Sequence, residues 1–370
     1  MPLQMRLDIF FEEIGHKEQT VSKQAFSKAR AKLDPDIVKS SFELTARTLA
    51  SCDDLELWGD KYRLCAIDGS DIALENEIPI IEHFGCSGSK KNAATAMASL
   101  CYDPLNNIIY DAGLYPYTQS EREAARTHIP VVQALPRPDG VQNLFIYDRG
   151  YPSHELFVEF IDTNVSFLMR VRKKFNREFD MVEKEERITF TYNDKNYQIR
   201  VLNLTLESGE KEILVTNLSE EDLKYDEAAA LYFKRWSIET KFRSLKSKLE
   251  LENMSGRRPI TVYQDFWAKM DMANTLAALE FTTNEVIEGN TSEHDSKYKK
   301  TTNESRLISK LSKRYLDIMC EPDAERRKEL LDILVKDIAK RPEDVKPGRK
   351  CARKIPRNRK FCDRYKRALC

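Results

Sequence analysis

The sequence predicts an α/β fold in which a central sheet carries a β-stranded insertion and is flanked by helical parts at both ends. Three observations lead to this prediction. Residues 62–114 contain short apolar runs separated by turn residues, which is the pattern of strands. Residues 165–218 repeat that pattern. Residues 20–50 and 226–281 instead place apolar residues at the spacing typical of helices.

Within the strand region, two apolar runs end in an aspartate. The run RLCAI ends at Asp68, and the run LFIY, which should be a buried central strand, ends at Asp148. Between them, TAMASLCY and IIYDAGL flank the turn DPLNN and predict a hairpin. Helices are expected at 121–134 and 153–163.

These patterns divide the chain into consecutive parts. The polar, unpatterned stretch 284–303 is expected to be a loop or linker. The expected parts are a helical amino-terminal region at 1–55, a main α/β domain at 56–283 with the β insertion at about 165–218, a linker with carboxyl-terminal helices at 284–340, and a basic tail at 341–370.

The amino-terminal region predicts two helices. Ser22 can cap the segment KQAFSKARAKL, and Asp34-Pro35 separates it from DIVKSSFELTARTLA. Eight basic and seven acidic residues lie in the first fifty, so charge does not mark this part as a DNA clamp. A helical cap on the main domain and a domain that binds DNA ends both stay open.

Charge is balanced overall but unevenly distributed. The 370 residues include 60 Lys or Arg and 60 Asp or Glu, which excludes a globally basic protein. The segment 346–367 nevertheless contains eleven basic residues and one acid, Asp363, an excess of the kind that binds phosphate backbones. A solvated, disordered basic end is the alternative.

The remaining composition points to a soluble, cytoplasmic protein. The eight cysteines form no C-x2-C pair and only five histidines are present, so reduced thiols are expected and a structural zinc site is not. The opening residues lack the apolar run of a signal peptide, and no apolar stretch approaches the roughly 18 residues of a membrane span.

A helix near residue 240 gathers chemically unusual side chains. Tyr232, Arg235, Glu239 and Lys246 fall within roughly 60° of one another at 3.6 residues per turn. Such a face can hold a metal ion and grip a phosphodiester beside it. Each residue also has an ordinary alternative, because Glu239 and Arg235 could form a surface i, i+4 pair.

The three acids together suggest a metal site. Asp68 and Asp148 at the ends of adjacent strands, with Glu239 on a helix over the sheet, would converge on a small volume. Clustered carboxylates repel one another unless cations neutralise them, and hard oxygen ligands suit Mg²⁺ or Mn²⁺. Taken singly, Asp68 and Asp148 could equally be turn or salt-bridge residues.

Taken together, these motifs resemble those of one known protein family. AIDGSDI, YDRGYPS and YFKRWSIETKFRSLK, in this order, resemble the DDE transposases of bacterial insertion sequences, and especially the branch with the Y-R-E-K signature, the insertion-sequence-four family. The segments VSKQAFSKARAKL and LVTNL and the basic tail are also similar, so the resemblance covers roughly residues 20–370.

The resemblance implies an RNase H-like catalytic core with the β insertion between the second and third acids. It implies that Asp68, Asp148 and Glu239 are catalytic and bind two Mg²⁺ ions, with Mn²⁺ as a possible substitute. Tyr232, Arg235 and Lys246 would contact DNA phosphates. The implied function is cut-and-paste DNA transposition, which means cleavage at terminal inverted repeats and transfer of the 3′-hydroxyl into target DNA. The resemblance also implies a homodimer that is associated with the nucleoid and has no small-molecule substrate.

Two departures from the family pattern concern DNA recognition. The tryptophan that some members carry in the β insertion is absent, because Trp58, Trp236 and Trp267 lie outside it; Phe167, Phe175 or Phe179 could replace it. Trp236 is expected to pack its helix onto the sheet. Little sequence precedes residue 20, so either the amino terminus is shortened or ends are read by residues 20–50 and the tail.

Two rival functions remain at this stage. One is a transposase-derived DNA-binding protein without catalysis, and the other is a stand-alone RNase H-like nuclease that never joins strands. The sequence exposes neither the terminal repeat, the target preference, the use of a hairpin intermediate nor the activity of this copy.

Overall fold

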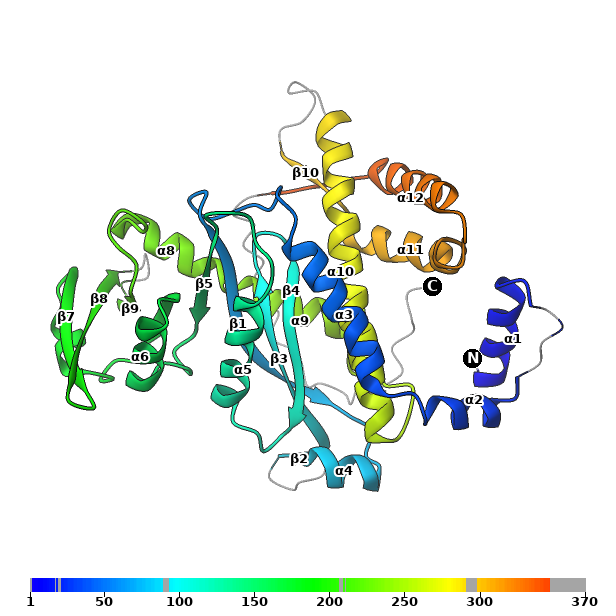
Figure 1. The fold of residues 1–370 in the computed structure, drawn as a ribbon, viewed down its shortest axis with the longest axis horizontal. Helices are drawn as coiled ribbons and strands as arrows, with labels where there is room; N and C mark the ends of the chain where they lie inside the picture. Colours follow the sequence, from blue (N-terminus) through cyan, green and yellow to red (C-terminus); the bar gives the residue numbers. More distant parts are fainter. Residues whose placement is uncertain are drawn as a thin grey trace. The chain divides into compact units, whose positions relative to one another are not determined.

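The computed structural model describes residues 2–16, 18, 21–88, 93–205, 209, 211–290 and 298–346. It forms two compact units (Figure 1). The larger contains Lys39–Asn274, and the smaller combines Met1–Val38 with Thr275–Cys370. The larger unit begins inside the third helix, whose residues 39–50 were expected in the amino-terminal region. These residues belong with the core because Phe42 is buried and its ring lies 5.7 Å from that of Trp267.

The larger unit is built around a nine-stranded mixed sheet (Figure 1). The strands run in the order β2-β3-β1-β5-β6-β9-β8-β7, with β4 paired to β3 outside this path. β1 is parallel to β5, and β5 to β6, whereas the other pairs are antiparallel. The strands are β1 (Tyr62–Ala73), β2 (Cys86–Ser87), β3 (Ala93–Asp103), β4 (Ile108–Pro116), β5 (Gln142–Tyr147), β6 (Ser166–Val171), β7 (Glu185–Tyr192), β8 (Lys195–Thr205) and β9 (Lys211–Thr216).

Helices flank this sheet, which confirms the predicted mixed α/β fold and is consistent with an RNase H-like core. The helices of the larger unit are α3 (Pro35–Ala50), α4 (Ile78–Phe84), α5 (Glu121–Gln133), α6 (His154–Asp162), α7 (Arg177–Met181), α8 (Tyr225–Lys234), α9 (Ser237–Ser247) and the first part of α10 (Pro259–Asn290). α5 packs against β1, β3 and β4, and α9 packs against β1. These two helices bring polar side chains to the central strand β1.

Turn chemistry accounts for both hairpins. Asn107, in the turn between β3 and β4, has φ +58°, a conformation that Asn tolerates better than most residues. Asn193 and Asp194, between β7 and β8, have φ +47° and +60°. Two consecutive residues with positive φ produce a tight turn whose twist matches that of the strands. The β3–β4 hairpin was predicted, and both hairpins are antiparallel.

The β-rich stretch 165–218 is not entirely an insertion. Its first strand, β6, pairs in parallel with β5, so it belongs to the core sheet. The added strands are β7, β8 and β9, and they continue the sheet because β9 pairs with β6. An apolar run such as SFLMRV has the same pattern in a core strand as in an insertion, so sequence alone could not separate the two.

A buried hydrogen-bonded chain fastens α5 to the hairpin. Ser99 Oγ lies 2.9 Å from His128 Nε2, and His128 Nδ1 lies 2.7 Å from Asp111 Oδ2. This order of groups resembles a hydrolase triad. Ser99 and His128 are completely buried, however, so a substrate cannot reach them, and the chain serves packing.

The smaller unit is helical in its described part. It contains α1 (Leu3–Glu13), α2 (Lys23–Arg30), α11 (Glu304–Met319), α12 (Ala324–Ala339) and the last part of α10, with the short pair β10 (Lys300–Thr301) and β11 (Glu343–Asp344). Ser22 caps α2 as predicted, since its side chain accepts the Ala25 N–H. The loop expected from residue 284 is wrong for 284–290, which continue α10. Residues 347–370, most of the basic tail, lie outside the described residues.

Candidate active site

Asp68 and Asp148 lie beside each other because of strand register. The parallel pairing of β1 with β5 ends at Ile67 and Tyr147, and each aspartate is the next residue along its strand. Asp148 therefore follows the end of β5, as predicted. Asp68 does not end its strand, because β1 continues to Ala73 along its other neighbour, β3. At Asp68 the strand loses only its β5 neighbour, which leaves space on that side.

The helix expected to carry all four signature residues is interrupted. α8 ends at Lys234 and α9 begins at Ser237, and the N–H groups of Arg235 and Trp236 bond to carbonyls three residues back. This tighter turn changes the direction of the side chains. Tyr232 thus lies on α8, Arg235 at the break, and Glu239 and Lys246 on α9. The expectation that Trp236 packs onto the sheet is wrong, since this residue is 44% exposed.

Arg235 lies between two of the predicted acids. Its Nη2 donates to Glu239 Oε1 at 3.2 Å, and its Nη1 lies 3.8 Å from Asp68 Oδ2. Arg235 is only 2% exposed, and its Nε–H has no hydrogen-bond partner within the described residues. A buried guanidinium thus supplies the positive charge that converging carboxylates require.

Tyr232 and Lys246 make different contacts. Tyr232 is 3% exposed and donates its hydroxyl to Asp148 Oδ1 at 3.0 Å. Lys246 donates to the carbonyl of Asp71 and pairs with Glu252 at 3.4 Å, which braces the end of α9 against β1. Of the three predicted DNA-contacting residues, Lys246 is therefore the one with a partly exposed side chain, at 28%.

Glu121 joins the site although the sequence did not indicate it. This first residue of α5 accepts the Tyr151 hydroxyl at 3.0 Å, and the same hydroxyl lies 3.5 Å from Asp68 Oδ1. A Cβ added to Gly69 would lie 2.6 Å from Glu121 Oε1, so the carboxylate of Glu121 approaches the β1 backbone where a side chain is missing. The sequence signals were the glycine after Asp68 and the tyrosine of the YDRGY segment, but neither residue indicates that it would contact Glu121.

The charge state of Asp68 follows from this crowding. The pKa of Asp68 is raised to about 6, mainly by burial and to a smaller extent by the nearby carboxylates of Glu121 and Glu239. The Arg235 guanidinium and the Gly69 N–H, which donates to Asp68 at 3.0 Å, act in the opposite direction. Burial prevails, so Asp68 exchanges a proton near neutrality.

The donors suit a divalent cation in type but are not assembled around one point. Carboxylate oxygens are the ligands that Mg²⁺ and Mn²⁺ prefer. Across the described ranges, no three His, Cys, Asp or Glu side chains lie close enough together to hold a metal ion. Arg235 occupies the gap between Asp68 and Glu239. Its cationic group stands where a metal ion would be attracted, and a metal ion there would require the guanidinium to withdraw.

Asp68 and Asp148 lie where the parallel pairing of β1 with β5 ends, and Glu239 lies on α9, which packs against β1. Acids of this type are those used in metal-dependent phosphoryl transfer. The sequence model described as "Transposase DDE domain" matches residues 59–274, more than half of the chain. The chain therefore belongs to the DDE transposase domain family. The three acids all lie inside the matched range.

Other comparisons add less. No curated protein sequence matches the chain. Among solved structures, it is similar to the piggyBac transposase synaptic complex with hairpin DNA, at 9% identity and a TM-score of 0.42. That match covers 74% of this chain and 57% of the other, so the chain spans little more than half of its length. No helix in the described part of the chain is long and apolar enough to cross a membrane.

Proposed function

We propose that this protein is a cut-and-paste transposase of the insertion-sequence-four branch. It would cleave DNA at the terminal inverted repeats of its element and transfer the 3′-hydroxyl into target DNA. The observation that carries the proposal is the register of β1 and β5, which places Asp68 beside Asp148, opposite Glu239 on α9. The Y-R-E-K spacing of Tyr232, Arg235, Glu239 and Lys246 favours this branch of the family.

Asp68, Asp148 and Glu239 are proposed as the catalytic acids and metal ligands. Two bound Mg²⁺ ions, or Mn²⁺ in their place, would supply the activation of a water or 3′-hydroxyl and stabilisation of the leaving oxygen. In the chain itself, the Tyr232 hydroxyl orients Asp148. The Arg235 guanidinium lies between Asp68 and Glu239 and offsets the repulsion between their carboxylates. Glu121 and Tyr151 fix Asp68 from the other side.

Arg235 is proposed to have two positions. In the position described here it neutralises carboxylates. When a metal ion takes over that charge, its guanidinium becomes available to a DNA phosphate, for which its planar fork is well suited. Tyr232 would be released in the same way, whereas the Lys246 side chain is already 28% exposed.

The larger assembly is proposed by the same reasoning. Double-stranded DNA, both terminal repeats and target, is the partner, and joining two ends calls for a homodimer. The helices at residues 20–50 and the basic tail are the proposed supplementary DNA contacts, and the nucleoid is the proposed location. The proposed parts remain the helical region 1–55, the catalytic domain 56–283, the segment 284–340 and the tail 341–370.

The test is DNA cleavage by the full chain on the repeats that flank its own gene. Asp148→Ala and Glu239→Ala should abolish Mg²⁺-dependent cleavage and leave end binding within about threefold, because each removes a ligand rather than a packing group. Asp139→Ala, an exposed loop aspartate, is the matched control and should cleave like the unmodified protein. Persistent cleavage by Glu239→Ala would overturn the assignment, and end binding without cleavage by the unmodified chain would favour the non-catalytic rival.

A further inference from the structure

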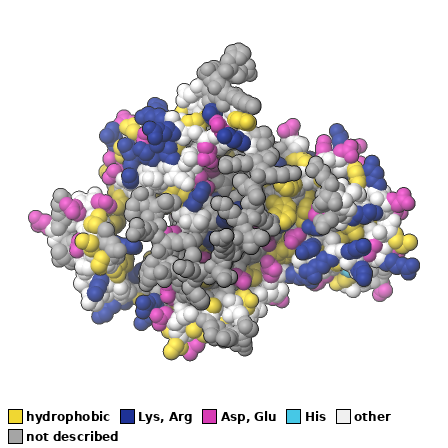
Figure 2. All heavy atoms as spheres, turned by 180° about the vertical axis from the view of Figure 1, so that it is seen from behind, with side chains coloured by type: hydrophobic (Ala, Val, Ile, Leu, Met, Phe, Trp, Pro, Cys, Tyr) yellow, Lys and Arg dark blue, Asp and Glu magenta, His cyan; other side chains and the backbone are white. Residues whose placement is uncertain are grey.

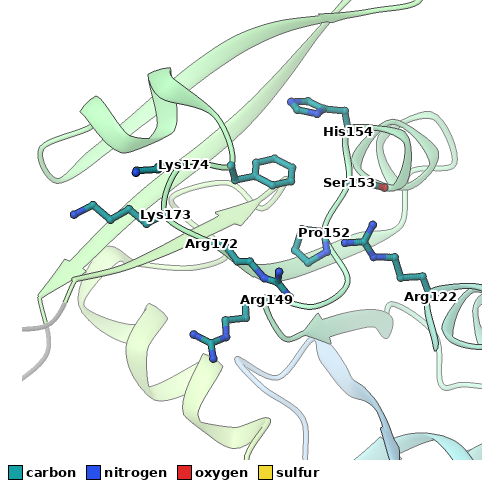
Figure 3. Close-up of a pocket in the computed structure, with 9 residues that line it drawn as sticks. Arg122, Arg149, Pro152, Ser153, His154, Arg172, Lys173 and Lys174 are labelled. Atoms are coloured by element: carbon teal, nitrogen blue, oxygen red, sulfur yellow. The ribbon is translucent and has the colours of Figure 1, made fainter. Parts of the chain in front are cut away.

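A pocket of about 390 Å³ opens in the larger unit next to the candidate active site (Figure 3). Five of its nine lining residues are Lys or Arg, and none is acidic. They come from three separate segments: Arg122 from α5, Arg149 from the loop after β5, and three consecutive residues after β6. The lining residues are Arg122, Arg149, Pro152, Ser153, His154, Arg172, Lys173, Lys174 and Phe175.

The five cationic side chains of this pocket form no ion pair in the described part of the chain, although the Asp180 carboxylate accepts the Lys174 backbone N–H at 2.9 Å. Within the residues that the structure describes, none of the five cations is within salt-bridge distance of a carboxylate. Arg122 is held by a neutral group, since its Nε donates to the carbonyl of Gly150 at 2.8 Å. The first turn of α6 adds to the field, because helix amino termini carry partial positive charge and Ser153 caps this one.

Aromatic rings give the pocket a firm wall. The rings of His154 and Phe175 stack at 5.0 Å with an interplanar angle of 20°. Phe157 and Phe190 lie behind His154, at 6.2 and 5.4 Å between ring centroids. Figure 3 shows His154 and Arg122 on the α6 and α5 side, with Lys173 and Lys174 on the opposite side. Partial burial lowers the pKa of His154, so the ring is neutral at physiological pH and the charge comes from the five cations.

The position and the surroundings of the pocket point to a nucleic-acid backbone. Arg149 directly follows Asp148, and Arg122 directly follows Glu121, so the cations border the carboxylates on one side. The chain as a whole is neutral, and its tail holds an excess of about ten positive charges. The rest of the chain is thus acidic by about the same amount. An unpaired group of five cations in an acidic body attracts an anion locally rather than through net charge.

We infer that this pocket binds backbone phosphates of the DNA strand that passes through the active site. The inference depends on the proposed function and adds a second contact to it: the carboxylates hold the reacting phosphodiester, and the five cations hold neighbouring phosphates of the same strand. Backbone contacts of this kind fix register without reading sequence. The pocket therefore sets the direction in which DNA leaves the site.

The test is the salt dependence of DNA binding by the full chain in EDTA, where cleavage cannot interfere. The probe is a fluorescent duplex of mixed sequence. The variant is Arg172→Ala with Lys173→Ala, and the matched control is Arg187→Ala with Lys195→Ala, two exposed cations of the β7–β8 hairpin. Because each phosphate contact contributes about 0.9 to the slope of log affinity against log salt, the pocket variant should lower that slope by about two and weaken binding about tenfold or more. The control should change neither quantity.

A second measurement locates the phosphate. Methylphosphonates are placed one at a time along the duplex. The inference predicts one or two positions where neutralisation weakens binding to the unmodified chain but not to the pocket variant. Equal slopes for the pocket and control variants would overturn the inference and leave the proposed function standing. The same holds if the pocket variant alone loses binding of inorganic pyrophosphate while its duplex binding is unchanged. Failure of the unmodified chain to bind any duplex would overturn both.

Discussion

At the scale of single residues, the arrangement of the candidate site depends on a glycine, Gly69, whose lack of a side chain leaves room for a neighbouring carboxylate. Gly69 follows Asp68, and its lack of a Cβ lets the Glu121 carboxylate approach the β1 backbone. Tyr151, which is 3% exposed, then donates its hydroxyl to Glu121 and lies near Asp68. Asp68 and Glu121 thus share a neutral donor on one side, and Arg235 lies near Asp68 on the other.

Removing that shared donor should destabilise the fold. Tyr151→Phe loses a buried hydroxyl that donates to a carboxylate, and bonds to charged groups contribute about 1.5–3 kcal/mol. We expect a decrease of that size in the free energy of unfolding, measured by urea denaturation. Tyr115→Phe is the control, because its hydroxyl pairs with Thr127 at an exposed position. Equal losses for the two variants would contradict the role given to Tyr151.

The raised pKa of Asp68 predicts how metal binding responds to pH. Asp68 must lose its proton to bind a cation, so Mn²⁺ affinity should fall as pH falls through about 6. Calorimetric titration in buffers of different ionisation enthalpy should detect the released proton. Asp68→Asn should lower the affinity and remove this pH dependence. Affinity that does not change across that range would contradict the proposed ligand.

The raised pKa of Asp68 also predicts how the stability of the metal-free protein depends on pH. An unfolded aspartate titrates at about 3.9, so the folded state, with a pKa of about 6, binds the Asp68 proton more tightly. The contribution of this group to stability is therefore greatest below about 3.9 and declines as pH rises towards 6. Comparison of Asp68→Asn with the unmodified chain by urea denaturation at each pH isolates this contribution from those of other carboxylates. A difference that does not vary with pH would contradict the shift.

At the scale of elements, sequence predicted kinds of structure better than boundaries. Asp148 at the end of β5, the β3–β4 hairpin and the helices α5 and α6 follow from apolar periodicity and turn residues. The break between α8 and α9 could not be foreseen, because YFKRWSIETKFRSLK has no Gly or Pro and its residues all suit a helix. Glu121 and the basic pocket were also missed, since both depend on segments that only the folded sheet brings together.

A buried cation strengthens the attachment of the β insertion, which is already paired to the core sheet through β9 and β6. Arg200 on β8 is 1% exposed, and its Nε donates to Glu185 Oε1 at 2.7 Å. Its Nη1 donates to the carbonyls of Ser219 and Leu223, in the connection from β9 to α8. This side chain therefore ties the added strands to the segment that leads to α8 and α9.

Arg200→Ala should accordingly lower the free energy of unfolding. It removes three hydrogen bonds and leaves the buried Leu223 carbonyl without the Arg200 donor, whereas the Ser219 carbonyl still accepts the Leu223 N–H. We therefore expect a loss of about 3 kcal/mol in the free energy of unfolding. Arg187→Ala, at the exposed residue paired with Arg200 across the β7–β8 hairpin, should change it by no more than about 0.5 kcal/mol. Chemical denaturation of the full chain measures both. A loss below 1 kcal/mol for Arg200→Ala would contradict its proposed role.

At the scale of the whole molecule, function depends on how charge is distributed. On the face drawn in Figure 2, Lys and Arg side chains gather in separate groups with acidic side chains among them, as the balanced composition requires. A neutral protein that binds DNA must concentrate its cations where the strand lies. The pocket beside Asp148 is such a concentration, and the basic tail is a second one in the sequence.

The central claim is that Asp68 on β1, Asp148 after β5 and Glu239 on α9 catalyse the joining of DNA strands. Strand transfer from a pre-cleaved terminal repeat with a free 3′-hydroxyl tests it most directly, with Mg²⁺, Mn²⁺ or EDTA present. The account predicts metal-dependent joining to target DNA that Asp148→Ala abolishes and Asp139→Ala retains. Cleavage of intact ends without any joining of pre-cleaved ends would contradict it and identify a nuclease instead.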